Sequence, residues 1–142
     1  MSSKLPEPTE RLRFREMTMA DLDVLAGLLG DPQVMTYYPE VKSRDQAAAW
    51  IQRNRQRYAE DGFGLWIIET HSGKFLGDCG LTWQNIGGRR DLEVGYHVHR
   101  EQQGRGFATE AARACRDFAW QLGFQRLTAN IHTRNAPPPA RR

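Results

Sequence analysis

A glycine-rich segment in the last third of the chain contains residue types that bind phosphate groups. It lies between an apolar stretch with strand periodicity and a long helical pattern. The first N–H groups of a helix have no partner within the helix, and the helix dipole favours negative charge there. Glycines also let the backbone approach a ligand closely. We expect an anion to bind this segment, which consists of Gln103, Gly104, Arg105, Gly106, Phe107 and Ala108, followed by the hydroxyl of Thr109.

Other phosphate-binding motifs fit this segment less well. A P-loop would end in Gly-Lys followed by Ser or Thr, and the chain has no such ending. A dinucleotide-binding fingerprint would need Gly or Ala at Thr109 and a repeated strand–helix–strand unit. The remaining alternative is an ordinary strand–helix turn with two flexible glycines. The combination of Gln103, both glycines and Ala108 favours anion binding over that alternative.

Two histidines lie just before the glycine-rich segment. His97 and His99 are two residues apart and so share one face of the expected strand. They could relay protons, although solvated or hydrogen-bonded histidines are the more ordinary interpretation. The four histidines lack metal-ligand spacing, and Cys79 and Cys115 form no Cys-x-x-Cys pair, so we expect no metal site. The cysteines are more simply interpreted as small buried side chains.

The sequence patterns place these residues in one mixed α/β domain. Alternating apolar residues predict strands, and apolar stripes at helical spacing predict helices. Thr18 with Asp21, and Ser43 with Gln46, have the spacing of helix capping boxes. The expected order is strand, two helices, three strands, helix and strand, with strands at 11–16, 65–70, 75–83, 92–98 and 126–131, a first helix after Thr18, and further helices at about 44–60 and 108–122.

Size and composition fit a single domain without a membrane span. The chain has 142 residues, 39% of them hydrophobic, and no apolar run is long enough to cross a bilayer. The net charge of +3 comes with scattered arginines and no basic stripe interleaved with aromatic residues, so we expect no nucleic-acid partner. The polar segment from Met1 to Glu10 is unlike a signal peptide, which favours a cytoplasmic location.

At the glycine-rich segment the chain resembles motif A of the GNAT superfamily of N-acetyltransferases. Gln103, Gly106 and Ala108 meet that motif, Gln/Arg-x-x-Gly-x-Gly/Ala. The sequences EVGY at 93–96, ATEA at 108–111 and TERLRFR at 9–15 are similar to the RimJ/RimL-type branch. The resemblance covers nearly all of residues 9–135. It implies a GNAT-type acyl-CoA N-acyltransferase fold, an α+β arrangement in which helices flank a mixed, mostly antiparallel sheet.

The resemblance implies an enzyme that moves an acetyl group from acetyl-coenzyme A to a primary amine by direct attack. The acceptor would be a protein N-terminus or a small-molecule amine. The backbone amides of residues 104–108 would hold the pyrophosphate of coenzyme A. The backbone of Tyr96, His97 and Val98 would pair with the pantetheine arm like an added strand. Asn135 matches an asparagine that often lies near the cofactor in this family.

The same resemblance suggests residues for the chemistry and the acceptor pocket. An attacking ammonium group must first lose a proton, so a base is required. Glu93 lies where the RimJ/RimL-type branch often has an acid and is the candidate catalytic base, with a surface or ion-paired carboxylate as the alternative. Tyr38 and Trp83 are candidate substrate contacts, whereas Trp66 is better interpreted as a core residue.

The chain departs from the family pattern after Asn135, where it continues as APPPARR. Family members continue with a helix and two more strands, and a tyrosine in that helix often protonates the leaving thiolate. We therefore expect a truncated domain at 9–135, with a flexible tail at 1–8, a Pro-rich irregular tail at 136–142 and no leaving-group acid. A homodimer could cover the open edge at 126–131. An acyl-coenzyme A-binding module with little turnover is the alternative function.

Overall fold

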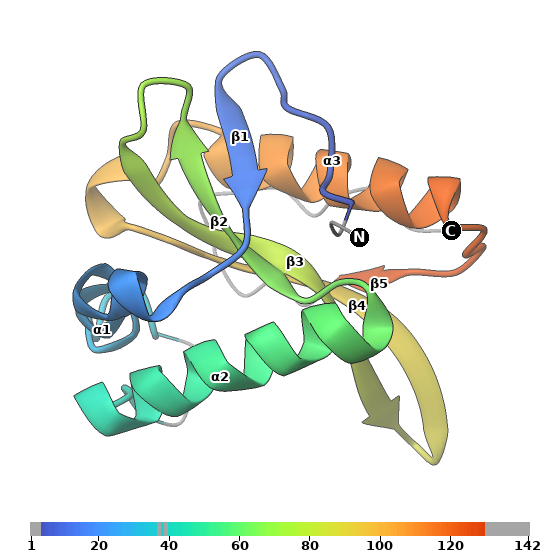
Figure 1. Cartoon of the computed structure of the whole chain (residues 1–142), viewed down its shortest axis with the longest axis horizontal. Coiled ribbons are helices and arrows are strands. Elements are labelled where there is room, and N and C mark those ends of the chain that lie inside the picture. The colour runs from blue at the N-terminus through green and yellow to red at the C-terminus, as the bar shows by residue number, and fades with distance from the viewer. Residues whose placement is uncertain (1–3, 37, 39, 130–142) are drawn as a thin grey trace.

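The fold is a five-stranded sheet with helices on both faces (Figure 1). The computed structural model describes residues 4–36, 38 and 40–129, so Asn135 and the segment 136–142 lie outside it. The order of elements is the one that the sequence predicts. Along the chain they are β1 (Leu12–Arg15), the 3-10 helix η1 (Met19–Asp21), α1 (Leu22–Leu29), α2 (Arg44–Asp61), β2 (Leu65–Thr70), β3 (Phe75–Ile86), β4 (Arg89–Val98), the 3-10 helix η2 (Arg100–Gln102), α3 (Phe107–Gln121) and β5 (Thr128–Ala129).

The sheet is mixed and mostly antiparallel, as expected. Its strands lie in the order β1-β2-β3-β4-β5, and the first three neighbouring pairs are antiparallel. Within the described residues only β4 and β5 run parallel, and their pairing there consists of Glu93 with Thr128 and Val94 with Ala129. The helices α1 and α2 cover one face of the sheet and α3 covers the other (Figure 1). We call these the α1/α2 face and the α3 face.

The hairpin between β3 and β4 sets the register of the central strands. Gly87 and Gly88 have φ values of +58° and +76°, which a two-residue type I′ turn requires at both positions. Ile86 therefore pairs with Arg89, and the pairing continues without a shift to Gly77 and Val98. Both strands are longer than predicted, since they extend to the turn itself. This regular pairing places residues of β3 opposite residues of β4 at positions that can be counted from the turn.

The helix ends confirm the local signals in the sequence. Thr18 and Asp21 form a capping box at η1, and Ser43 and Gln46 form another at the start of α2. The side-chain oxygen of the first residue in each box accepts a backbone N–H that would otherwise have no partner. Among the described residues no helix is long and apolar enough to cross a membrane.

The fifth strand begins two residues later than predicted. Within the described residues β5 covers only Thr128–Ala129, and residues 130 and 131 of the predicted strand lie outside that part of the chain. Arg126 and Leu127 precede the strand and belong to the connection from α3. Arg126 forms an ion pair with Asp91 at 3.3 Å, and Leu127 is buried in the core.

Two apolar clusters hold the layers together. The cluster on the α3 face contains Trp66, which is fully buried as predicted and lies edge-on to Phe118 at 5.3 Å between ring centroids. Cys79 and Cys115 are also fully buried there, with their Sγ atoms 3.7 Å apart. The cluster on the α1/α2 face joins the helices to the apolar side chains of β2, including Ile67.

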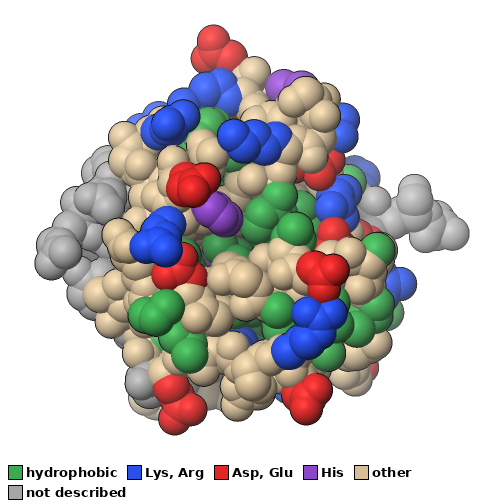
Figure 2. All heavy atoms as spheres, turned by 90° about the vertical axis from the view of Figure 1, so that its left-hand side faces the viewer, with side chains coloured by type: hydrophobic (Ala, Val, Ile, Leu, Met, Phe, Trp, Pro, Cys, Tyr) green, Lys and Arg blue, Asp and Glu red, His purple; other side chains and the backbone are tan. Residues whose placement is uncertain are grey.

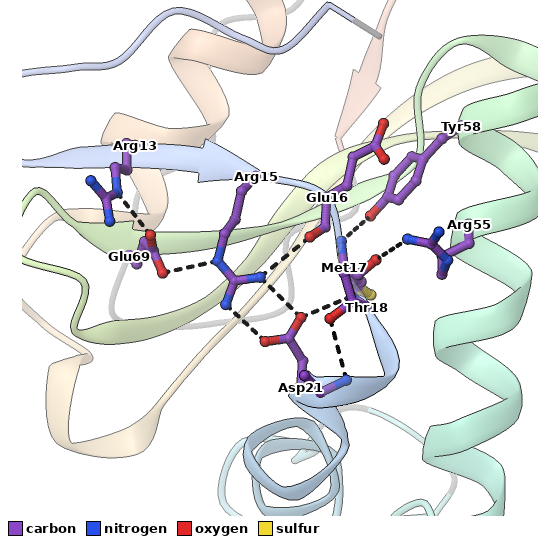
Figure 3. A network of polar contacts seen from close by, with 10 residues as sticks. Arg13, Arg15, Glu16, Met17, Thr18, Asp21, Arg55, Tyr58 and Glu69 are labelled. Carbon is purple, nitrogen blue, oxygen red and sulfur yellow. Dashed lines mark hydrogen bonds and ion pairs between the residues drawn. The ribbon is translucent and has the colours of Figure 1, made fainter. Parts of the chain in front are cut away.

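Polar contacts connect the end of β1 to α2 and β2 (Figure 3). The hydroxyl of Tyr58 donates to the carbonyl of Leu65 and accepts the N–H of Met17. Arg15 lies 2.7 Å from Asp21 and 3.1 Å from Glu69, so it joins η1 to β2. Burial of Asp21 opposes its ionisation, but hydrogen bonds from Arg15 and Thr18 outweigh that effect and hold its pKa below the ordinary range. These contacts fix α2 over the sheet.

Candidate active site

The predicted anion-binding loop has the backbone geometry that such a site requires. Gly104 and Gly106 both have φ of +81°, a conformation that favours glycine. Gly106 is the N-cap of α3, and no side chain caps the helix there. The first N–H groups of α3 are therefore available to a ligand, and the helix dipole favours an anion at this end. The buried hydroxyl of Thr109 has no hydrogen-bond partner among the residues described.

The loop is held in place by contacts that the sequence did not reveal. Arg11 donates to the carbonyl of Arg105 at 2.8 Å, and its guanidinium lies 4.3 Å from the centre of the Phe107 ring. Arg11 also pairs with Glu110 at 2.6 Å. Burial opposes ionisation of Glu110, but bonds from Thr9 and Arg11 outweigh it and lower its pKa. Arg11 thus balances the one carboxylate in the first turn of α3.

The side-chain amide of Gln103 has a role within the protein. It donates to the carbonyl of Val98 at 3.0 Å, which joins the loop to the end of β4. A groove of about 680 Å³ lies between the N-terminal segment and α3, and Gly106 and Thr109 line part of it. Its lining also includes four carboxylates and two arginines: Glu7, Glu10, Glu110, Asp117, Arg11 and Arg113.

The end of β4 nearest the loop presents a free backbone edge in the described part of the chain. β5 pairs with β4 no further than Val94. The backbone N–H of His97 donates to Asp78 of β3 at 3.0 Å, and that of His99 donates to Leu76 at 2.9 Å. Because backbone groups alternate in direction along a strand, those of Tyr96 and Val98 face the opposite, open edge. The His97 N–H is directed away from it.

Glu93 and Tyr38 come together on the α1/α2 face. Glu93 is half-buried, and this burial raises the pKa of its carboxyl group. Burial, together with the nearby carboxylates of Asp78 and Glu93, raises the pKa of Tyr38 to about 12. Tyr38 lies in the connection between α1 and α2, so this connection reaches the β4 face that carries Glu93. The structure therefore brings together two of the predicted site residues.

A buried pair that the sequence analysis missed lies on the same face. His97 Nδ1 is 2.8 Å from Asp78 Oδ1, and Asp78 is fully buried. The ring centroids of Tyr38 and Trp50 lie 5.2 Å and 5.8 Å from that of His97. The signal for Asp78 was present: counting back from the two-glycine turn pairs it with His97. Trp50 could not be found in this way, because helix packing brings it there.

Trp83 lies apart from the other predicted site residues. It packs on the α3 face, where its ring centroid is 6.2 Å from that of Phe63 and 5.5 Å from that of Phe124. Side chains alternate along a strand, so Trp83 and Thr82, the partner of Glu93, point to opposite faces. The residues described contain no cluster of side chains that could hold a metal ion. On the face shown in Figure 2, charges of both signs are interspersed around hydrophobic side chains and a histidine.

A match to a family model over most of the chain shows which family this protein belongs to. Residues 11–138 match the model of the acetyltransferase (GNAT) domain. This chain belongs to the GNAT acetyltransferase family. It is 39% identical over 138 residues to the uncharacterized protein YkkB of Bacillus subtilis, with 95% of this chain and 80% of YkkB covered. It is 32% identical over 135 residues to the uncharacterized N-acetyltransferase p20 of Bacillus licheniformis, with 91% of this chain and 74% of p20 covered.

Solved structures share the fold. The acetyltransferase from Agrobacterium tumefaciens superimposes with a TM-score of 0.78 at 24% identity, covering 95% of this chain and 79% of that one. RimL, a ribosomal L7/L12 alpha-N-protein acetyltransferase solved with coenzyme A, gives a TM-score of 0.69 at 16% identity, covering 89% and 73% of the two chains. The GNAT fold expected from the sequence is thereby confirmed, and the family implies an acetyl-coenzyme A-dependent acyltransferase.

Proposed function

We propose that this GNAT protein transfers the acetyl group of acetyl-coenzyme A to a primary amine, which attacks the thioester directly. The observation that carries the proposal is the uncapped start of α3. There the first N–H groups of α3 have no capping side chain, and the loop from Gln103 to Ala108 follows the end of β4 whose edge is open in the described part of the chain. The loop amides and the Thr109 hydroxyl would bind the pyrophosphate of coenzyme A. RimL is one relative in fold that has been solved with coenzyme A.

The open edge of β4 suits the pantetheine arm. That arm carries amide groups, and an extended chain of amides can pair with a free strand edge as an added strand does. Tyr96 would offer both its backbone groups to it and Val98 its N–H, since the His97 N–H is used by Asp78 and the Val98 carbonyl already accepts from Gln103. Running back along β4 from the loop, the arm would carry the thioester toward Gly95. A Cβ at Gly95 would meet no heavy atom within 4 Å, so this position is open.

Glu93 would act as the general base. Its half-buried position raises the pKa of its carboxyl group, which makes the carboxylate a better proton acceptor than an exposed one. Tyr38 lies close enough to Glu93 for the carboxylate to affect its phenol, so the connection between α1 and α2 would form the acceptor pocket. We propose an amine at a protein N-terminus or on a small molecule as the acceptor.

A charge comparison at Gly104 tests the cofactor site. A Cβ there meets nothing within 4 Å, and both Asn and Asp tolerate its positive φ. Asp and Asn have nearly the same size, so Gly104→Asp and Gly104→Asn differ mainly in charge. We expect the Asp variant to bind acetyl-coenzyme A at least about tenfold more weakly than the Asn variant, by calorimetry. Equal affinities of the two variants for acetyl-coenzyme A would refute the proposal that this loop binds the phosphate groups. Gly62→Asp, at another positive φ, is the control for folding.

Replacement of Glu93 separates turnover from binding. For Glu93→Gln we expect kcat/KM for the amine to fall about 10²–10⁴-fold while the Kd for acetyl-coenzyme A stays unchanged. Release of the coenzyme A thiol, measured with N-terminal peptides and small amines, gives the rate and the acceptor class. Glu60→Gln, on the exposed end of α2, is the matched control. Binding of acetyl-coenzyme A without thiol release by any amine would favour a binding module over an enzyme.

A further inference from the structure

The buried pair of Asp78 and His97 contains polar atoms without a hydrogen-bond partner in the described residues. One carboxylate oxygen, Oδ1 of Asp78, receives both the ring Nδ1 and the backbone N–H of His97. Only 6% of His97 is exposed. In the described part of the chain, Oδ2 of Asp78 and Nε2 of His97 have no hydrogen-bond partner. Buried polar groups normally have partners, so the free Nε2 points to a use outside the resting structure.

The second observation is the order of side chains along β4. Glu93, Gly95 and His97 occupy alternate positions and therefore share the α1/α2 face. Gly95 leaves this face open between the two proton-handling side chains, each about 7 Å away along the strand. The anion-binding loop follows the His97 end of the strand. A thioester that reaches Gly95 from that loop would have its sulfur on the His97 side and the attacking amine on the Glu93 side.

We propose that His97, oriented by Asp78, is the acid that protonates the departing coenzyme A thiolate. The proposal rests on the acetyltransferase function proposed above. In this role the ring acts as an imidazolium, and the carboxylate of Asp78 is the partner that such a buried charge requires. Both nitrogens of an imidazolium carry a proton, so Nδ1–H donates to Asp78 and Nε2–H is left to donate to the thiolate. His97 fills the role for which the sequence named no residue.

Glu93 and His97 together account for every proton that moves in the reaction. The neutral amine attacks, its nitrogen–carbon bond forms and the carbon–sulfur bond breaks. The amine nitrogen gives its proton to Glu93, and Nε2 of His97 gives one to the thiolate. Passage of the proton from Glu93 back to His97 through solvent restores both groups. Beginning from the ammonium form of the acceptor, one proton is released to solvent for each acetyl group transferred.

One of the groups packed around His97 could compete with it as the proton donor to the thiolate. Tyr38 and Trp50 cover its ring, and Lys42 Nζ lies 5.1 Å from the centre of the Trp50 ring. Asp78 and Glu93 are the carboxylates that face this region. Tyr38 is the other group with a proton to give, and its pKa of about 12 makes it a weak acid. An imidazolium is ordinarily the far stronger acid.

The test compares two acetyl donors. For His97→Gln, in the full chain, we expect kcat with acetyl-coenzyme A to fall about 10²–10³-fold. The Kd for acetyl-coenzyme A should change less than about threefold. With p-nitrophenyl acetate, whose leaving group needs no proton, the loss should be less than about threefold. His71→Gln, in an exposed turn, should match the wild type with both donors.

Each other outcome overturns the proposal. An equal loss with both donors would show a structural or base role for His97, and an unchanged kcat would show no role. If His97→Gln does not fold, Asp78→Asn takes its place, because an equal loss with both donors in that variant would contradict acid catalysis by a His97 that Asp78 orients. A loss confined to acetyl-coenzyme A in Tyr38→Phe, with His97→Gln unchanged, would assign the acid to Tyr38. Absence of any thiol release by the wild type would refute the proposed function itself.

Discussion

The hydroxyl of Tyr58 provides a direct measure of how the helical layer is held over the active site. In Tyr58→Phe the ring stays in place, parallel to that of Trp66 with 6.4 Å between centroids. The hydroxyl is lost, so the N–H of Met17 and the carbonyl of Leu65 lose this partner inside the protein. Leaving a buried polar group unpaired costs about 1–3 kcal/mol, and we take about 1–2 kcal/mol for each of these two groups. We expect the free energy of unfolding to fall by about 2–4 kcal/mol.

Thermal unfolding is the assay. An unfolding entropy of about 2.1 cal/mol/K per residue, over 142 residues, converts that loss into a Tm lower by about 7–13 °C. Tyr96→Phe is the matched control, since no residue in the described ranges bonds to its buried hydroxyl. Its Tm should stay within about 2 °C of the wild type. A Tyr58→Phe variant that melts no lower than Tyr96→Phe would refute the reasoning.

Three further predictions concern stability and reactivity. In Gly77→Ala the new Cβ would lie 2.0 Å from the carbonyl oxygen of His97, so we expect a loss of more than about 3 kcal/mol by urea unfolding, whereas Gly27→Ala in α1, where nothing lies within 4 Å, should gain about 0.5–1 kcal/mol. The pKa of Asp21 is lowered in the folded state, so its contribution is complete above the unfolded pKa of about 3.9 and is lost as pH falls through the folded value. Asp21→Asn should therefore be less stable than the wild type at about pH 7, and the gap should narrow below about pH 4; a constant gap would contradict the assignment. Burial raises the pKa of the Cys79 thiol and Cys115 is equally buried, so neither should react with a thiol reagent until guanidinium chloride unfolds the protein.

Much of the fold could be predicted from short stretches of sequence. The capping boxes at Thr18 and Ser43, the two-glycine turn and the loop before α3 each depend on residues within a few positions of one another. Their geometry is set by backbone conformation and nearby hydrogen bonds, which a short stretch of sequence specifies. The element order and the family resemblance followed from them. The two-glycine turn would also have fixed Asp78 opposite His97.

Tertiary packing decided what surrounds the proposed chemistry. Arg11 reaches the loop before α3 from a position 94 residues earlier, and helix packing brings Trp50 of α2 to His97 of β4. Trp83 is a tryptophan like Trp50, but it packs on the other face of the sheet. No local pattern encodes such distances, because they depend on how separate elements bury their apolar faces against one another. The sequence alone predicted the glycine-rich loop at the start of α3, because its conformation depends on neighbouring residues, whereas the pair of Asp78 and His97 is buried, oriented and covered only in the folded chain.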